Sequence, residues 1–256
     1  MDIFFEIHKD LPREGPGDSV STRKALSLLK DLPSNPLILD IGCGPGMQTL
    51  DLARYTKGKI IAVDNHQPFL EQLHQRALAE GLTGHISTAN QSMFELKFPE
   101  KSFDLIWCEG AIYIIGFEQG LRAWRPLLRG PNPASGNPGG HVAVTEISWL
   151  KPNPPEEVLS YWTAEYPGMR GIDENLRSLR VAGYRELGHF ALPPSSWWTD
   201  YYTPIEARLP GLREKYCGNP EAKAMLDATQ KECDIHRKYS DWYGYVFYLM
   251  QIDDQF

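Results

Sequence analysis

The sequence predicts an α/β protein with a mostly parallel sheet that is covered by helices on both faces. Two apolar runs, residues 37–39 and the β-branched run 59–63, are each followed by a turn and then by a stretch with helical periodicity. Strands that alternate with helices in this way pack as parallel neighbours. Residues 243–252 are almost continuously apolar, as a strand buried on both faces requires. The 256 residues are enough for one large α/β domain.

The first strand, which contains the apolar run 37–39, ends in a glycine-rich turn. Three glycines follow Asp40 at alternate positions: Gly42, Gly44 and Gly46. Glycine permits unusual backbone angles and lets a ligand approach bare backbone, which is typical of a nucleotide-type site at the carboxyl edge of a parallel sheet. The dinucleotide fingerprint would need its third glycine at Met47, and no Gly-Lys-Ser/Thr follows. A carboxylate at Asp40 also repels a pyrophosphate, which favours a cationic or hydrogen-donating ligand.

The second strand, at 59–63, ends at Asp64, eighteen residues after Gly46. An acidic residue at this point is placed to accept both hydroxyls of a ribose. Asn65 or Gln67 can cap the helix that follows. A lone aspartate at a strand end is equally well explained as a helix cap, but its distance from the glycine turn favours ribose binding.

Two further segments point to the same edge of the sheet. Ser92 and Met93 follow the expected third strand, and the strand at 103–108 leads into Glu109 and Tyr113. Because the carboxyl ends of parallel strands meet at one edge, these residues should face one ligand together with the glycine turn.

The remaining elements follow from the same periodicities. Ser19 or Ser21 can cap a helix at 19–32, after a turn-rich loop. Further along we expect a helix at 117–129, a strand at 141–149, helices at about 155–165 and 172–182, and a strand at 184–192. Residues 130–140 contain seven Gly or Pro among eleven residues, which predicts a flexible surface loop.

These motifs resemble those of class I S-adenosylmethionine-dependent methyltransferases over essentially the whole chain. The run from Asp40 to Gly46 resembles motif I of that family, and Phe-Asp-Leu-Ile from Phe103 resembles the opening of its fourth strand. The segments 15–17, 109–117 and 243–247 look like a bacterial small-molecule subgroup, similar to the ubiquinone/menaquinone C-methyltransferase group. The resemblance implies a three-layer sandwich with a seven-stranded sheet, its last strand antiparallel, an N-terminal helical cover and a helical insertion before the last strand.

The resemblance also implies a cofactor, S-adenosyl-L-methionine, and the residues that hold it. These are Arg13, Asp40, Gly42, Cys43, Gly44, Gly46, Asp64, Asn65, Ser92, Met93 and Glu109. Many relatives have an aspartate where this chain has Ser92, so here the adenine contact is weaker or is made by backbone.

The expected reaction is an in-line displacement that transfers the methyl group to a small-molecule acceptor. Glu109 is the first candidate for a base, with Tyr113 orienting the acceptor by a hydrogen bond; Glu109 could equally bind the ammonium of the cofactor. Weaker candidates for the base are His85, His141 and His189. For the acceptor site we expect Tyr113 and three tryptophans, Trp149, Trp197 and Trp198, although core packing is the alternative for each aromatic residue.

The domain organisation follows from these elements. Residues 1–35 are expected to form an N-terminal lid helix and loop, and residues 36–256 the methyltransferase domain. This domain would include the loop at 130–140 and an aromatic, helical insertion at about 195–240, above the active site.

The composition limits the kinds of partner that we expect. The net charge is −7 and the 26 basic residues are scattered, which argues against nucleic acid and anionic membranes as partners. We see no signal peptide and no apolar run long enough to span a membrane, so we expect a cytoplasmic protein. The four cysteines fit no zinc pattern, so no metal is expected, and the oligomeric state is not indicated.

Two other functions remain open at this point. One is a non-catalytic sensor of S-adenosylmethionine or S-adenosylhomocysteine. The other is a nicotinamide oxidoreductase on a related sheet, which the glycine spacing disfavours.

Overall fold

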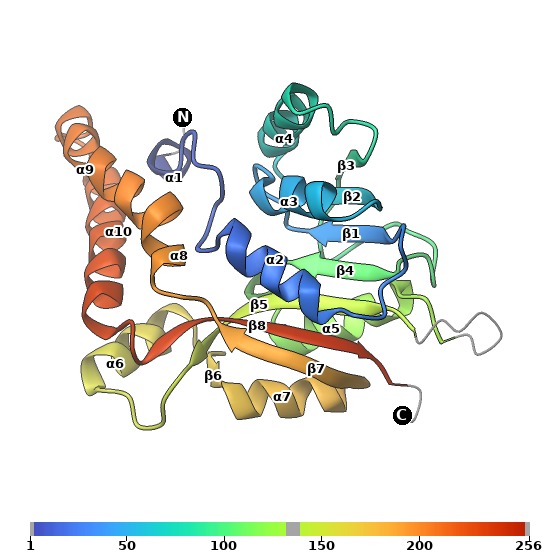
Figure 1. Ribbon diagram of the computed structural model, residues 1–256. Coiled ribbons are helices and arrows are strands. Elements are labelled where there is room, and N and C mark those ends of the chain that lie inside the picture. The colour runs from blue at the N-terminus through green and yellow to red at the C-terminus, as the bar shows by residue number, and fades with distance from the viewer. Residues whose placement is uncertain (1–2, 132–138, 254–256) are drawn as a thin grey trace.

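A computed structural model describes residues 3–131 and 139–253, which are arranged around one twisted sheet (Figure 1). The strands follow the order β3-β2-β1-β4-β5-β8-β7, with β6 beside β5. Their bounds are β1 Leu37–Ile41, β2 Lys59–Asp64, β3 Ile86–Asn90, β4 Leu105–Cys108, β5 His141–Trp149, β6 Arg170–Gly171, β7 Tyr184–Ala191 and β8 Tyr243–Ile252. β8 pairs antiparallel with both β5 and β7, whereas the remaining pairs of the described sheet are parallel.

Helices cover both faces of the sheet. Their bounds are α1 Ile3–Ile7, α2 Ser19–Leu28, α3 Met47–Tyr55, α4 Gln67–Ala79, α5 Phe117–Trp124, α6 Glu156–Glu165, α7 Ile172–Val181, α8 Ser195–Trp197, α9 Thr203–Lys215 and α10 Pro220–Tyr239. Short helical turns occur at Ile112–Ile114, Arg125–Leu127 and Trp198–Tyr202. The expected fold is therefore confirmed, with the two-residue β6 as an additional strand. The central part of the expected loop at 130–140, residues 132–138, lies outside the described residues.

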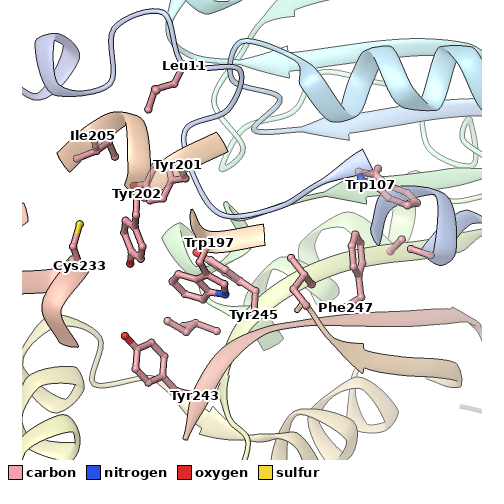
Figure 2. Close-up of a cluster of buried hydrophobic side chains, with 14 of the residues drawn as sticks. Leu11, Trp107, Trp197, Tyr201, Tyr202, Ile205, Cys233, Tyr243, Tyr245 and Phe247 are labelled. Atoms are coloured by element: carbon pink, nitrogen blue, oxygen red, sulfur yellow. The ribbon is translucent and has the colours of Figure 1, made fainter. Parts of the chain in front are cut away.

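The two faces of the sheet have separate cores because successive side chains of a strand point in opposite directions. In β1, Ile38 packs into the core that α2 and α3 cover, whereas Leu39 and Ile41 pack into the core beneath α5 and α7. All ten residues of β8 are buried, which explains its continuous apolar sequence. Figure 2 shows part of the first core, in which the Trp107 and Phe247 rings lie with centroids 5.5 Å apart.

The segment between β7 and β8 consists of α8, a π-helical turn, α9 and α10, and it lies at one end of the sheet (left in Figure 1). α1, which the sequence did not predict, packs against α9 and α10 there. The helices of the described chain include none with the length and apolar character that a membrane span needs.

Candidate active site

The glycine turn after β1 has the backbone geometry that its sequence predicts. Gly42, Gly44 and Gly46 have positive φ angles of 71°, 53° and 89°. The amide groups of Gly42 and Cys43 both donate to the Val63 carbonyl oxygen, at 2.8 and 2.9 Å. A Cβ atom at Gly42 would lie 2.6 Å from the Cβ atom of Ala111, so a larger residue does not fit.

Asp64 connects the end of β2 to this turn. Its Oδ2 atom accepts a hydrogen bond from the Gly44 amide at 2.9 Å, and its Oδ1 atom accepts one from the His66 amide at 2.9 Å. The carboxylate is thus fixed beside bare backbone, at the edge where a ribose is expected.

A cavity of about 530 Å³ opens above these strand ends, and we call it the strand-end cavity. Most of the expected cofactor residues line it: Arg13, Gly42, Cys43, Gly44, Asp64, Asn65, Ser92, Met93 and Glu109. Phe4 and Phe5 of the unpredicted helix α1 also line it, and the Phe5 ring stacks on His66 with centroids 4.1 Å apart. The structure therefore brings residues from four strand ends, those of β1, β2, β3 and β4, and from the N-terminal segment to one space.

Asp40 is an exception and corrects our expectation of a ligand contact. Its side chain is fully buried beneath the turn and does not line the strand-end cavity. Thr49 Oγ1 donates to its Oδ2 atom at 2.6 Å, and burial raises the pKa of this carboxyl to about 7. Asp40 therefore connects β1 to α3. Gly46 is likewise absent from the lining, because it forms the N-cap of α3, where a Cβ atom would lie 2.3 Å from Leu73 Cδ1.

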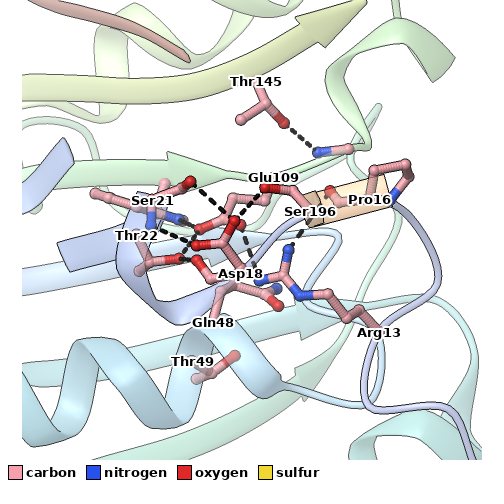
Figure 3. Close-up of polar contacts among 12 residues, drawn as sticks. Arg13, Pro16, Asp18, Ser21, Thr22, Gln48, Thr49, Glu109, Thr145 and Ser196 are labelled. Atoms are coloured by element: carbon pink, nitrogen blue, oxygen red, sulfur yellow. Dashed lines mark hydrogen bonds and ion pairs between the residues drawn. The ribbon is translucent and has the colours of Figure 1, made fainter. Parts of the chain in front are cut away.

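Glu109, the expected base, is held by three donors, of which Arg13 and Thr22 are labelled in Figure 3. Arg13 Nη2 lies 2.9 Å from its Oε2 atom, while Thr22 Oγ1 and Trp107 Nε1 donate to Oε1 at 2.8 and 2.9 Å. The side chains of Arg13 and Glu109 are only 4% and 2% exposed. These three donors occupy three of the roughly four acceptor positions of the carboxylate, and Oε2 keeps one, so the geometry favours a role in binding and positioning over proton transfer.

The loop that carries Arg13 is also attached to the late helical segment. Asp18 accepts hydrogen bonds from the Ser21 amide at 2.7 Å and from Ser196 Oγ, and the Gly17 amide donates to the Ser196 carbonyl oxygen at 3.0 Å. These contacts hold the N-terminal segment over the carboxyl edge of the sheet (Figure 3).

A second cavity of about 290 Å³ adjoins the first, and we call it the tyrosine cavity. Six residues line both cavities: Phe4, Glu14, Gly15, Pro16, Gly110 and Tyr113. Most of its remaining wall is aromatic, from Tyr161, Trp162, Tyr166, Trp197, Tyr201, Tyr202 and Tyr245. Figure 2 shows Trp197, Tyr202 and Tyr245 gathered in this region.

The expected acceptor residues divide into two groups. Tyr113 lies at the junction of the cavities, and Trp197 lines the tyrosine cavity, although its ring is stacked between His236 and Tyr245 at centroid distances of 4.3 and 5.2 Å. Trp149 and Trp198 line neither cavity, which corrects that part of our expectation. They pack instead on Tyr243 and Arg237 respectively, because the sequence could not distinguish structural from pocket aromatics.

None of the three candidate histidines lines either cavity. His85 Nδ1 contacts the Gly58 carbonyl oxygen at 2.9 Å, His141 is buried at the start of β5, and exposed His189 pairs with Glu186. This corrects their assignment as possible bases.

Sequence reasoning missed Glu14, which lies between Arg13 and the Gly-Pro-Gly turn and reaches both cavities. Its Oε2 atom is buried without a hydrogen-bond partner. Burial and the nearby charge of Asp64 raise the pKa of Glu14 to about 7, against the opposing effect of Arg76. The one feature of the sequence that could have indicated Glu14 is its position directly before the Gly-Pro-Gly turn.

Comparisons with known proteins agree with this geometry. Residues 38–130 match a family model described as "Methyltransferase domain". The chain is 30% identical over 118 residues to methyltransferase GfsG of Streptomyces halstedii, covering 46% of this chain and 40% of the relative. It is 29% identical over 231 residues to sterol 24-C-methyltransferase erg6 of Aspergillus fumigatus, covering 77% and 58%. The chain thus spans about half the length of these curated relatives.

Among solved structures, a methyltransferase from Thiobacillus denitrificans in complex with S-adenosyl-L-homocysteine superposes with a TM-score of 0.81. The two chains are 19% identical and each is covered to 98%. The bound product in that structure agrees with the expected cofactor. Residues 38–130 are therefore similar to a methyltransferase domain, and the chain has the Rossmann-like fold of the S-adenosyl-L-homocysteine-bound methyltransferase.

Proposed function

We propose that this protein transfers a methyl group from S-adenosyl-L-methionine to a small-molecule acceptor. The observation that carries the proposal is the junction of two cavities at the carboxyl ends of β1, β2, β3 and β4. The larger cavity, about 530 Å³, lies within the usual size of small-molecule sites, and the smaller offers room for a second reactant beside it.

The residues of the strand-end cavity fit this cofactor. Asp64 presents a carboxylate for the ribose hydroxyls, and Ser92 and Met93 lie where the adenine is expected. The bare backbone of Gly42 and Gly44 lines the same cavity as Arg13, where the amino acid portion of the cofactor would lie. When bound, the cofactor supplies a methyl group activated by a positively charged sulfur.

The protein's own contribution is to orient the acceptor and exclude water. The N-terminal segment, held by the Arg13–Glu109 pair, covers the junction, and Tyr113 can orient the acceptor there. Orientation alone can contribute roughly 7–11 kcal/mol to catalysis. In this proposal Glu109 binds the ammonium group of the cofactor and does not act as the base.

The same proposal includes the domain organisation, the location in the cell, the partners and the subgroup of the protein. Residues 1–35 act as the lid and residues 36–256 as the catalytic domain of a cytoplasmic enzyme that has no nucleic-acid or membrane partner. The subgroup similar to the ubiquinone/menaquinone C-methyltransferases remains our assignment, although the relatives include a sterol 24-C-methyltransferase, and that name leaves the acceptor atom of this chain open.

Calorimetry with both cofactor forms, followed by methyl transfer from labelled S-adenosylmethionine to a panel of metabolites, tests the proposal. We expect both cofactor forms to bind and at least one metabolite to be labelled. Binding without any transfer would favour a sensor, and binding of a nicotinamide cofactor instead would favour an oxidoreductase.

A further inference from the structure

The tyrosine cavity has features that restrict what it can hold. Its volume of about 290 Å³ lies at the lower end of ligand sites, so its occupant is small. Five tyrosines belong to its wall beyond the shared junction: Tyr161, Tyr166, Tyr201, Tyr202 and Tyr245. Tyrosine combines an apolar ring, whose face attracts cations, with a hydroxyl group that forms hydrogen bonds.

The acidic side chains of this cavity have no basic counterpart in its wall. Glu14 lies at the junction with the strand-end cavity, Glu232 of α10 lines the wall, and the exposed Glu165 of α6 also contributes. Neither lysine nor arginine occurs among the described residues that line it. His8 also contributes, but burial lowers the pKa of its ring, which therefore carries no charge at neutral pH.

Two of these carboxyl groups have too few hydrogen-bond donors, and no lysine or arginine in the described wall of the cavity, to offset the cost of their burial. Glu232 Oε1 accepts a hydrogen bond from Tyr202 Oη at 2.8 Å, and burial raises the pKa of Glu232. Glu14 Oε2 has no hydrogen-bond partner. A buried carboxylate is costly unless a positive charge or hydrogen-bond donors accompany it. A small organic cation would provide that charge and would contact the tyrosine rings at the same time.

We propose that the tyrosine cavity binds the methyl acceptor as a small organic ammonium ion, with Glu14 and Glu232 as its counter-charges. This inference rests on the proposed function and adds the class of substrate, an amine. An ammonium nitrogen must lose one proton before it can be methylated, and Glu14 Oε2 at the junction accepts that proton. The freed lone pair then forms the new N–C bond, while the S–C bond breaks and its electron pair stays on sulfur.

A pair of probes with the same shape tests the proposal directly. Choline carries a trimethylammonium group, and 3,3-dimethylbutan-1-ol has a neutral tert-butyl group in its place. Both are titrated into the full-length protein, with and without saturating S-adenosylhomocysteine, and tryptophan fluorescence or ligand NMR reports binding. We expect choline to bind at least about tenfold more tightly than the alcohol. Equal affinities, a preference for the alcohol, or no binding of either probe would overturn the proposal.

Two variants locate the charge that is responsible. Glu232→Gln keeps the size of the side chain and an oxygen that can accept the Tyr202 hydrogen bond, so the preference for choline should fall to about threefold or less. Glu221→Gln, an exposed position on the same helix, is the matched control and should retain the preference. An unchanged preference in Glu232→Gln would contradict its role as a counter-charge, and if that variant fails to fold, the wild-type comparison still decides.

The design separates this inference from the proposed function. If S-adenosylhomocysteine does not bind but choline is still preferred, the cation site stands and the proposed methyltransferase function fails. If S-adenosylhomocysteine binds and choline is not preferred, only the assignment of an amine acceptor fails.

Discussion

Arg13 and Glu109 form a buried ion pair across 96 positions of the chain, with Arg13 Nη2 2.9 Å from Glu109 Oε2. Arg13 belongs to the loop between α1 and α2, and Glu109 follows β4 directly. The pair therefore fixes the N-terminal segment over the carboxyl edge of the sheet, where the two cavities meet.

Arg13→Met should lower the free energy of unfolding by about 3–5 kcal/mol, because it leaves the Glu109 carboxylate buried without its counter-charge. Chemical denaturation measures this loss. In the double variant Arg13→Met/Glu109→Met, the loss should be smaller than the sum of the two single losses. Strictly additive losses would show that the two side chains do not interact in solution.

Gly42→Ala should weaken both folding and cofactor binding, because the new Cβ atom meets the Ala111 Cβ at 2.6 Å and the residue has a φ of +71°. Gly81→Ala is the matched control, since Gly81 has a φ of +69° with no atom within 4 Å of the added Cβ. The control should lose about 1–2 kcal/mol of stability from backbone strain alone, and Gly42→Ala should lose more. Denaturation and S-adenosylhomocysteine titration of both variants measure the difference, and equal losses would refute the steric argument.

Asp64→Ala should weaken S-adenosylhomocysteine binding by about 1–3 kcal/mol, because the hydrogen bonds from the ribose hydroxyls to a charged acceptor are lost. The same change removes the acceptor of the Gly44 amide, so the turn itself also loses support. Calorimetry gives the affinity, with Glu71→Ala on the neighbouring helix α4 as a control that should bind normally. Unchanged affinity in Asp64→Ala would exclude the ribose assignment.

Glu146 should make stability depend on pH. Burial raises the pKa of this carboxyl from 4.5 to about 8, although Tyr166 Oη donates to its Oε1 atom at 2.8 Å. Between these values the unfolded chain releases the proton and the folded chain keeps it, so the free energy of unfolding falls as the pH rises. Glu146→Gln removes this effect, and its stability relative to wild type should increase by about 1.4 kcal/mol per pH unit in that window.

Urea denaturation at several pH values from about 5 to 8 provides this measurement, because this interval lies between the two pKa values of Glu146. The exposed Glu214→Gln serves as the control and should run parallel to wild type. Parallel profiles for Glu146→Gln as well would show that Glu146 is ionised in the folded protein.

Cysteine reactivity should follow burial. Cys217 is exposed, whereas Cys43, Cys108 and Cys233 are buried, and burial raises the pKa of each of these three thiols. Iodoacetamide at neutral pH should therefore modify Cys217 alone in the native protein, because the thiolate is the reactive form. Peptide mass spectrometry identifies the sites, and labelling at Cys43 would contradict the closed turn seen here.

Elements with a strong periodic pattern were predictable from the sequence. The strands at 141–149 and 243–252 have the expected bounds, because the first alternates apolar and polar residues and the second is almost continuously apolar, and both are buried over nearly their whole length. The strand Ile86–Asn90 has three polar residues among five and is only partly buried, so its pattern is weak. The helix Ile3–Ile7 is too short to show periodicity and depends on packing against α9 and α10.

The parts of the candidate site that the backbone determines were predictable from the sequence. The parts that depend on the direction of a side chain were not. The glycine pattern and the strand ends predicted Gly42 and Asp64 as site residues, and both line the strand-end cavity. Asp40 turns inward because Thr49, nine residues later, supplies a donor from α3, and Glu109 is engaged by Arg13 from a distant segment. Such partners depend on tertiary contacts that spacing along one strand does not reveal.

The central claim is that the strand-end cavity binds S-adenosylmethionine, and calorimetric titration of the wild-type protein with S-adenosylhomocysteine tests it most directly. The account predicts saturable binding of one molecule per chain and no heat from a nicotinamide dinucleotide under the same conditions. Absence of binding by S-adenosylhomocysteine, or saturable binding of the dinucleotide in its place, would contradict it.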